Sequence, residues 1–291
     1  MRKVSLVLGA VFVGAISIWA LGAATPGAGI ISSGGGGASL PPQTGNSGKF
    51  LTTDGTDASW GTVTTGLNAP NTSFELIDEF IGAPVASART GAIGFMPNTS
   101  GTSASVAAGT ATDSALGVWD LATGTDTSGR SNIQPVAIGS VCLGAGEVIF
   151  EARIKIDALS DGTNTYTAWA GLIDAGNGEG TDAICFRYIH SANSGKWLAY
   201  TRSNSTETTI DTGTAFAANT WYRLRAVVNA DASNVAFSVN GGTAVNITTN
   251  IPKATARATG PGLTILKSAG ATSRTMTVDY YYLKFTPTGG R

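Results

Sequence analysis

Oxygen-bearing side chains crowd one short loop of the chain. Between residues 174 and 182 the sequence places Asp174, Asn177, Glu179 and Asp182. Oxygen ligands at close spacing are what a hard cation such as Ca²⁺ requires. The loop departs from the EF-hand pattern because Gly176 stands where that pattern has Asp or Asn. A calcium site and a plain hairpin loop therefore both remain open, and no other cofactor is expected.

Aromatic side chains and one arginine lie on the segments that flank this loop. The set consists of Trp169, Arg187, Tyr188, Trp197 and Tyr200. Aromatic faces cover the apolar side of a sugar ring, and planar polar groups bond its hydroxyls. The set is therefore a candidate glycan-binding patch. Packing in the protein core is the alternative interpretation.

Residues suited to catalysis are scarce. Two cysteines and one histidine leave little material for a zinc site or a Cys–His nucleophile. Glu147 and Glu151 share one face of an expected strand, but at that spacing they stand ~13 Å apart, beyond the ~5 Å of a retaining glycosidase pair. We expect no catalytic residue. Cys142 and Cys185 could form a disulfide in an oxidising compartment or could be small hydrophobic strand residues.

Charge and composition exclude several classes of protein. Only 13% of the 291 residues are charged and the net charge is -1. The chain therefore lacks the excess of Lys and Arg that is typical of nucleic-acid-binding proteins. Hydrophobic residues make up 42% and aromatic residues 8% of the chain, which is enough to build a core. The surface must therefore consist mainly of small uncharged polar residues.

The first part of the chain is not expected to belong to the folded domain. Arg2 and Lys3 precede an uncharged apolar run from Val4 to Ala24. This order predicts a signal peptide or a membrane anchor over residues 1–24. Residues 25–73 are rich in Gly, Ser, Thr and Pro and read as a flexible linker.

Beyond Phe74, short segments with alternating hydrophobicity are separated by turn signals such as Asn240-Gly241-Gly242. This pattern predicts an all-β, antiparallel two-sheet jelly-roll sandwich over residues 74–288. Within residues 82–140 the pattern is weaker. There we expect strands at 91–96 and 115–121 and an exposed loop at 98–112.

A motif in the linker resembles a known module. The stretch LPPQTGNSGKFLTTDGTDASW, from Leu40 to Trp60, resembles a short module common in bacteriophage tail-fibre and related virion proteins. Its turn pairs predict a small β-hairpin neck within residues 40–63. Because an isolated hairpin is marginally stable, packing of three copies is expected to stabilise it, which predicts a homotrimer.

The C-terminal part resembles the concanavalin A-like, laminin-G-like jelly roll. The resemblance rests on residues 219–225 (NTWYRLR), 237–241 (FSVNG) and 278–283 (VDYYYL). Some members of that fold are glycosidases with an E-x-D-x-x-E motif. The nearest stretch here, Glu75 to Glu79, has a different spacing.

Together these features predict a non-enzymatic bacteriophage virion structural protein, either a tail fibre or a surface decoration. Its partners would be a host-surface glycan and other virion proteins, and its location would be the virion surface. A secreted or surface-anchored bacterial carbohydrate-binding protein is the alternative. A glycoside hydrolase is the third hypothesis.

Overall fold

The computed structural model describes residues 42, 44–47, 49–53, 58–62, 73–85, 90–91, 93–112, 114–135, 139–176, 180–189 and 195–289. The chain divides into two compact units, residues 1–65 and 66–291. Each unit is described by itself. The apolar run from Val4 to Ala24 lies outside the described residues, and among those that are described no helix is long and apolar enough to cross a membrane.

The first unit contains the predicted hairpin. Strands β1 (Lys49–Thr53) and β2 (Ala58–Thr62) pair antiparallel, with Leu51 opposite Trp60. The indole Nε1 of Trp60 donates to the carbonyl oxygen of Pro42 at 3.0 Å, and Nδ2 of Asn46 donates to the same oxygen at 2.8 Å. The segment before the hairpin is therefore tied to its second strand, and the predicted hairpin is confirmed.

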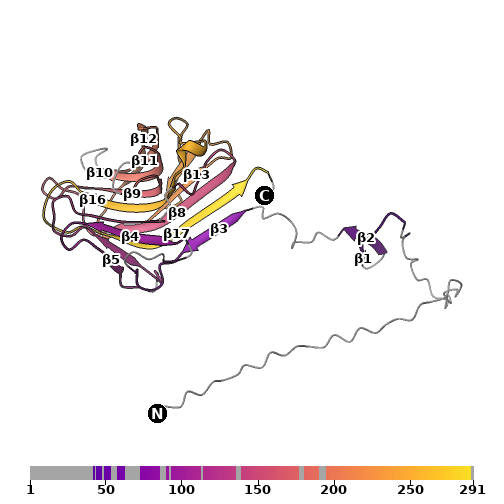
Figure 1. The fold of residues 1–291 in the computed structure, drawn as a ribbon, viewed down its shortest axis with the longest axis horizontal. Helices are drawn as coiled ribbons and strands as arrows, with labels where there is room; N and C mark the ends of the chain where they lie inside the picture. Colours follow the sequence, from indigo (N-terminus) through magenta and orange to yellow (C-terminus); the bar gives the residue numbers. More distant parts are fainter. Residues whose placement is uncertain are drawn as a thin grey trace, which may run out of the picture. The chain divides into compact units, whose positions relative to one another are not determined.

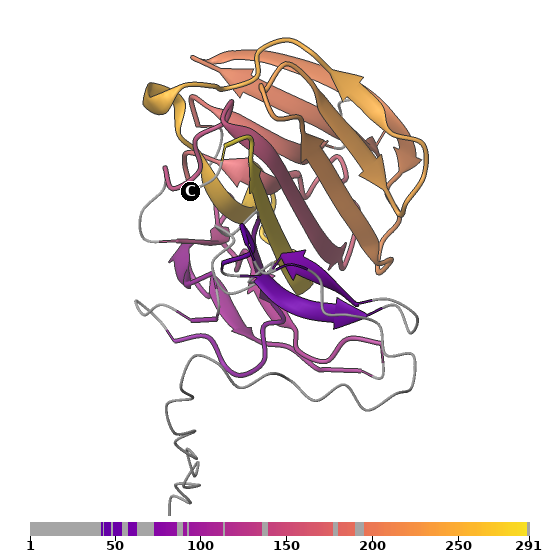
Figure 2. The ribbon, with the colours of Figure 1, turned by 90° about the vertical axis from the view of Figure 1, so that its right-hand side faces the viewer.

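The second unit is a sandwich of two antiparallel sheets, drawn as two layers in Figures 1 and 2. The seven-stranded sheet runs β12 (Thr206–Ala215), β11 (Lys196–Ser203), β10 (Ala183–Ile189), β9 (Tyr166–Ile173), β16 (Gly260–Lys267), β7 (Arg130–Pro135) and β4 (Phe95–Ser100). The eight-stranded sheet runs β15 (Val245–Ile247), β14 (Val235–Val239), β13 (Tyr222–Val228), β8 (Gly146–Ile156), β17 (Thr275–Pro287), β6 (Trp119–Ala122) and β5 (Ser105–Ala108), with β3 (Phe74–Asp78) also paired to β17.

Alternation along the strands creates the core between the two sheets. On β8 the even-numbered residues from Val148 to Ile156 are buried, as the sequence pattern predicts for a half-buried strand. Aromatic rings fill the centre: Phe186 packs edge-on against Phe150 and Phe237, with ring centroids 6.2 Å and 5.3 Å apart. The hydrophobic pattern thus fixes which face of each strand is available to solvent or a ligand.

Strand β17 organises the eight-stranded sheet. It pairs with β8 along its length, and along its other edge it pairs first with β6 and then with β3. A bulge between Val278 and Tyr280 shifts the register with β8. The buried hydroxyl of Tyr281 donates to the carbonyl oxygen of Gly171 at 2.9 Å, which links this sheet to the opposite one.

The weakly patterned region differs from expectation in two places. Strand β4 begins at Phe95 rather than Gly91, and the expected exposed loop at 98–112 contains the end of β4 and all of β5. Strand β6, at 119–122, overlaps the expected strand at 115–121. Small and polar residues dominate these edge strands, so their pairing depends on partners distant in sequence rather than on local alternation. Cys142 and Cys185, both described, form no disulfide with each other; Cys142 is exposed and Cys185 is buried.

Candidate functional site

The predicted aromatic patch is divided between the two faces of the seven-stranded sheet. Tyr188 and Trp197 point inward and are fully buried in the main core cluster, with ring centroids 5.9 Å apart. Trp169, Arg187 and Tyr200 point outward. The expectation of one shared patch is therefore corrected. The side-chain period of two places Arg187 and Tyr188 on opposite faces of β10.

The three outward residues lie beside polar residues of neighbouring strands. Trp169 on β9 pairs in register with Thr264 on β16, and Thr264 pairs with Asn132 on β7. Gln134 follows two residues after Asn132, so it shares the outer face. We call Asn132, Gln134, Thr264 and Trp169 the polar cluster.

Buried polar atoms without partners distinguish the polar cluster. Asn132 and Thr264 are 0% exposed and Trp169 is 5% exposed. Within the described part of the chain, no hydrogen-bond partner reaches the buried atoms Nδ2 and Oδ1 of Asn132, Oε1 of Gln134, Oγ1 of Thr264 or Nε1 of Trp169. Each such buried atom costs about 1–3 kcal/mol of stability unless something bonds to it. The cluster therefore has both unpaired donors and unpaired acceptors.

The chain after β9 packs onto this cluster. A Cβ atom on Gly176 would lie 1.9 Å from Oε1 of Gln134 and 2.5 Å from Nδ2 of Asn132. A side chain here would displace the ends of the two amide side chains, and glycine lets the main chain approach both of them. The side-chain amides of Asn132 and Gln134 thus lie close to each other, next to the main chain at Gly176.

An arginine stands at one end of the polar cluster. Arg130 lies on the outer face of β7, two residues before Asn132, and its Nη2 donates to Oδ1 of Asn98 at 3.1 Å. Asn98 on β4 is itself in register with Asn132. The buried Nε of Arg130 has no hydrogen-bond partner, and among the described residues no carboxylate forms an ion pair with this side chain.

The opposite end of the cluster carries a balanced charge pair. Arg187, in register with Trp169, stacks over the ring of Tyr200 with its guanidinium carbon 4.3 Å from the ring centroid. Its Nη1 lies 3.4 Å from Oε2 of Glu207, which also accepts a hydrogen bond from the hydroxyl of Tyr200 at 3.1 Å. The charge of Arg187 is therefore already compensated within the protein.

The candidate calcium loop is described only in part, because Asn177 and Glu179 lie outside the described residues. Oδ2 of Asp174 accepts hydrogen bonds from the main chain and hydroxyl of Thr181. Asp182 accepts from the main-chain nitrogen of Asn204 at 3.0 Å and lies 3.3 Å from Nη1 of Arg257. The described residues contain no group of three metal-binding side chains, and an arginine on Asp182 disfavours a cation there. The calcium site stays a prediction.

The two glutamates considered for catalysis lie on the outer face of the eight-stranded sheet. Glu151 accepts a hydrogen bond from the hydroxyl of Tyr280 at 2.5 Å and lies 3.3 Å from Nη1 of Arg225. Burial, together with the hydrogen bond to Glu151, raises the pKa of the Tyr280 hydroxyl. Glu151 is thus part of a structural network rather than one half of a carboxylate pair with Glu147.

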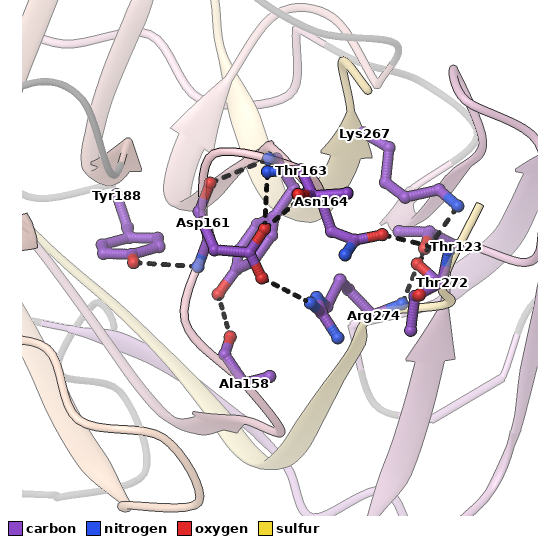
Figure 3. A network of polar contacts seen from close by, with 11 residues as sticks. Thr123, Ala158, Asp161, Thr163, Asn164, Tyr188, Lys267, Thr272 and Arg274 are labelled. Carbon is purple, nitrogen blue, oxygen red and sulfur yellow. Dashed lines mark hydrogen bonds and ion pairs between the residues drawn. The ribbon is translucent and has the colours of Figure 1, made fainter. Parts of the chain in front are cut away.

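A separate polar network closes one end of the sandwich (Figure 3). The carboxylate of Asp161 accepts hydrogen bonds from the main-chain nitrogens of Thr163 and Asn164, and it pairs with Nη2 of Arg274 at 3.2 Å. The buried Nζ of Lys267 donates to the carbonyl oxygens of Gly124 and Thr272. These charged groups all have protein partners, so the network holds loops together.

Sequence reasoning missed Asn132, Gln134, Thr264 and Arg130. The chain is rich in Asn and Thr throughout, and β7 has the sequence RSNIQP, which gives a weak strand signal. Only the register of the strands brings these residues together, because β7 and β16 are more than a hundred residues apart in the sequence. The period of two on β7 is the one signal that would have placed Asn132 and Gln134 on one face.

Comparison with known proteins identifies the family. The family described as SO2946-like, C-terminal domain, matches residues 114–279, which is more than half of the chain. The chain belongs to the SO2946-like family. The protein of unknown function SO2946 from Shewanella oneidensis MR-1 has a similar structure, with a TM-score of 0.55 and 14% identity over 75% of this chain and 89% of that one. No curated protein matches the chain.

Two further solved structures align with the chain over most of their own length. The endo-1,3-beta-glucanase from Streptomyces sioyaensis aligns with a TM-score of 0.49 and 14% identity over 75% of this chain and 98% of that one. The carbohydrate recognition domain of Emp47p aligns with a TM-score of 0.48 and 10% identity over 74% and 96%. The fold is a concanavalin A-like jelly roll, as the sequence resemblance predicts.

Proposed function

We propose that this SO2946-like protein is a non-enzymatic carbohydrate-binding protein whose ligand lies on the outer face of the seven-stranded sheet, at the polar cluster. The observation that carries the proposal is the set of buried donors and acceptors on Asn132, Gln134, Thr264 and Trp169 that find no partner among the described residues. Sugar hydroxyls both donate and accept hydrogen bonds, so one saccharide can satisfy amide, hydroxyl and indole groups at once.

The absence of catalysis is part of the same proposal. Glycoside hydrolysis needs two carboxylic groups on either side of the scissile bond. The outward residues of β7, β9 and β16, the strands that carry the cluster, include no Asp or Glu. This composition supports binding over hydrolysis and ranks the glycoside hydrolase hypothesis below the other two.

The test replaces Thr264 by Val, which keeps the shape of the side chain and removes the unpaired hydroxyl. Loss of one hydrogen bond to the ligand is expected to weaken binding about tenfold on a glycan array. The melting temperature should stay the same or rise, because no protein partner is lost. Products of glycan cleavage should not form with the wild-type chain.

Thr277→Val is the matched control. The hydroxyl of Thr277 bonds to Oδ1 of Asp120 at 2.6 Å on the opposite sheet. This variant should lose stability and keep glycan binding. Full binding by Thr264→Val together with a lower melting temperature would contradict the proposed site, because the hydroxyl would then be structural.

The biological setting that we propose is the surface of a phage particle, where the sandwich would bind a host glycan. The support is the resemblance of residues 40–60 to the tail-fibre module. Mass spectrometry of purified virions should detect the protein. If the protein is absent from particles and its mature N-terminus is Ala24 or Thr25, the alternative of a secreted or surface-anchored bacterial protein is correct.

A further inference from the structure

We infer that the saccharide bound at the polar cluster is acidic and that Arg130 pairs with its negatively charged group. This inference rests on the proposed function, because it names the class of sugar that the same face would bind. It depends on one feature of the structure, an arginine beside the polar cluster whose charge the described residues leave unbalanced.

Arg130 lies beside the polar cluster, two residues before Asn132 on β7. Its Nη2 donates to Oδ1 of Asn98 on β4, and Asn98 is in register with Asn132, so the guanidinium reaches across to β4 at the level of Asn132. Nε of Arg130 and both amide atoms of Asn132 are buried and unpartnered within the described residues. One ligand group in this position could therefore reach the arginine and the amide together.

The electrostatics at this end of the cluster favour an anion. A half-buried guanidinium without a counter-charge is costly, and a carboxylate or sulfate can accept two parallel hydrogen bonds from it. The amide of Asn98 accepts a hydrogen bond from Arg130 but carries no charge, so it does not balance the positive charge of Arg130. An acidic group on the ligand would supply the missing counter-charge.

The other arginine on this face does not compete for the anion. Arg187 is paired with Glu207 and stacked on Tyr200, and Glu207 would repel an acidic group. The charge pattern is therefore asymmetric across the cluster. The acidic group should lie at the β7 end, and uncharged hydroxyls should lie toward Trp169 on β9.

The experiment compares acidic and neutral probes on the full chain. The acidic probes are tetragalacturonate, 3′-sialyllactose and a sulfated lactose, and the neutral probes are chitotetraose, cellotetraose and lactose. At least one acidic probe should bind about tenfold or more tightly than the neutral sugars, and its affinity should fall as salt increases. The separate carboxylate and sulfate arms identify which acidic group is preferred.

The variant Arg130→Gln should remove the preference for acidic probes and most of the salt dependence. Arg130→Lys, which keeps the charge without the planar fork, should retain part of the preference. Arg225→Gln is the control, because Arg225 pairs with Glu151 on the opposite sheet and should not affect binding. The salt dependence of the wild-type chain tests the inference even if Arg130→Gln does not fold.

The outcomes separate the inference from the proposed function. Equal binding of neutral and acidic probes, or an acidic preference that Arg130→Gln retains, would overturn the role of Arg130 and leave carbohydrate binding intact. If no saccharide binds, both the proposed function and the inference are wrong. Acidic binding that depends on both Arg130 and Thr264 supports both.

Discussion

At the scale of single residues, hydrogen bonds and ion pairs within the protein show which polar side chains have structural roles. Asp161 and Glu207 bond to groups of the protein itself, whereas Asn132 and Thr264 are buried and have no partner within the described residues. Evolution toward stability alone would replace such groups by apolar residues of similar shape. Their presence on one face is the reason for assigning the ligand there rather than to the aromatic residues.

Asp161 provides a prediction that depends on pH. Hydrogen bonds from the main-chain nitrogens of Asn164 and Thr163, with a smaller effect of Arg274, lower the pKa of the Asp161 carboxyl below its unfolded value of 3.8. A lowered pKa in the fold stabilises the protein above pH 3.8 and loses that effect as pH falls through the folded pKa. Asp161→Asn should therefore lower the melting temperature at pH 7.

The same variant should differ little from the wild type at pH values below the folded pKa of Asp161. Thermal unfolding followed by circular dichroism between pH 2.5 and 7 measures both effects. Glu147→Gln, which removes a carboxylate outside this network, is the control. A constant difference between Asp161→Asn and the wild type across this pH range would show that the ionised carboxylate has no special role.

At the scale of elements, main chain packs on main chain where β3 meets the start of β6. A Cβ atom on Gly117 would lie 2.2 Å from the carbonyl oxygen of Glu79 and 2.7 Å from the nitrogen of Ile81. Nε1 of Trp119 also donates to the carbonyl oxygen of Gly82 at 2.8 Å. The segment after β3 is thus attached to the entry of β6.

Gly117→Ala should destabilise the sandwich by about 1–3 kcal/mol, because rigid backbone atoms cannot move aside as a flexible side chain would. Urea denaturation followed by tryptophan fluorescence measures the change. Gly162→Ala is the matched control, since nothing lies within 4 Å of its Cβ position. Equal effects of the two substitutions would refute the close packing at Gly117.

At the scale of the whole molecule, the hairpin and the sandwich are separate compact units. The hairpin is small, and Leu51 is 44% exposed on it, so its stability is expected to come from neighbouring copies. We predict that the full chain is a trimer and that residues 66–291 alone are a folded monomer. Size-exclusion chromatography with light scattering distinguishes these states, and a monomeric full chain would contradict the trimer.

Local patterns predicted much of this protein. The period of two from Glu147 to Asp157, the turn at Asn240-Gly241 and the motif at 40–60 were enough to predict the sandwich and the hairpin, because burial of one strand face is encoded in neighbouring residues. The edge strands β4 and β5 were misplaced, because their residues are small or polar and carry little alternation.

The candidate site was decided by tertiary structure. The sequence alone indicated an all-β, weakly charged protein with aromatic residues near a loop. Alternation along a strand separates Tyr188 from Arg187, but only the packing of the two sheets shows that Tyr188 is on the inner face and Arg187 on the outer face. That Asn132 and Thr264 have no partner within the described part of the chain became visible only when β7, β16 and β9 were placed side by side. Register across strands joins residues distant in the chain, and a hydrogen bond that is missing can be recognised only when all neighbours are known.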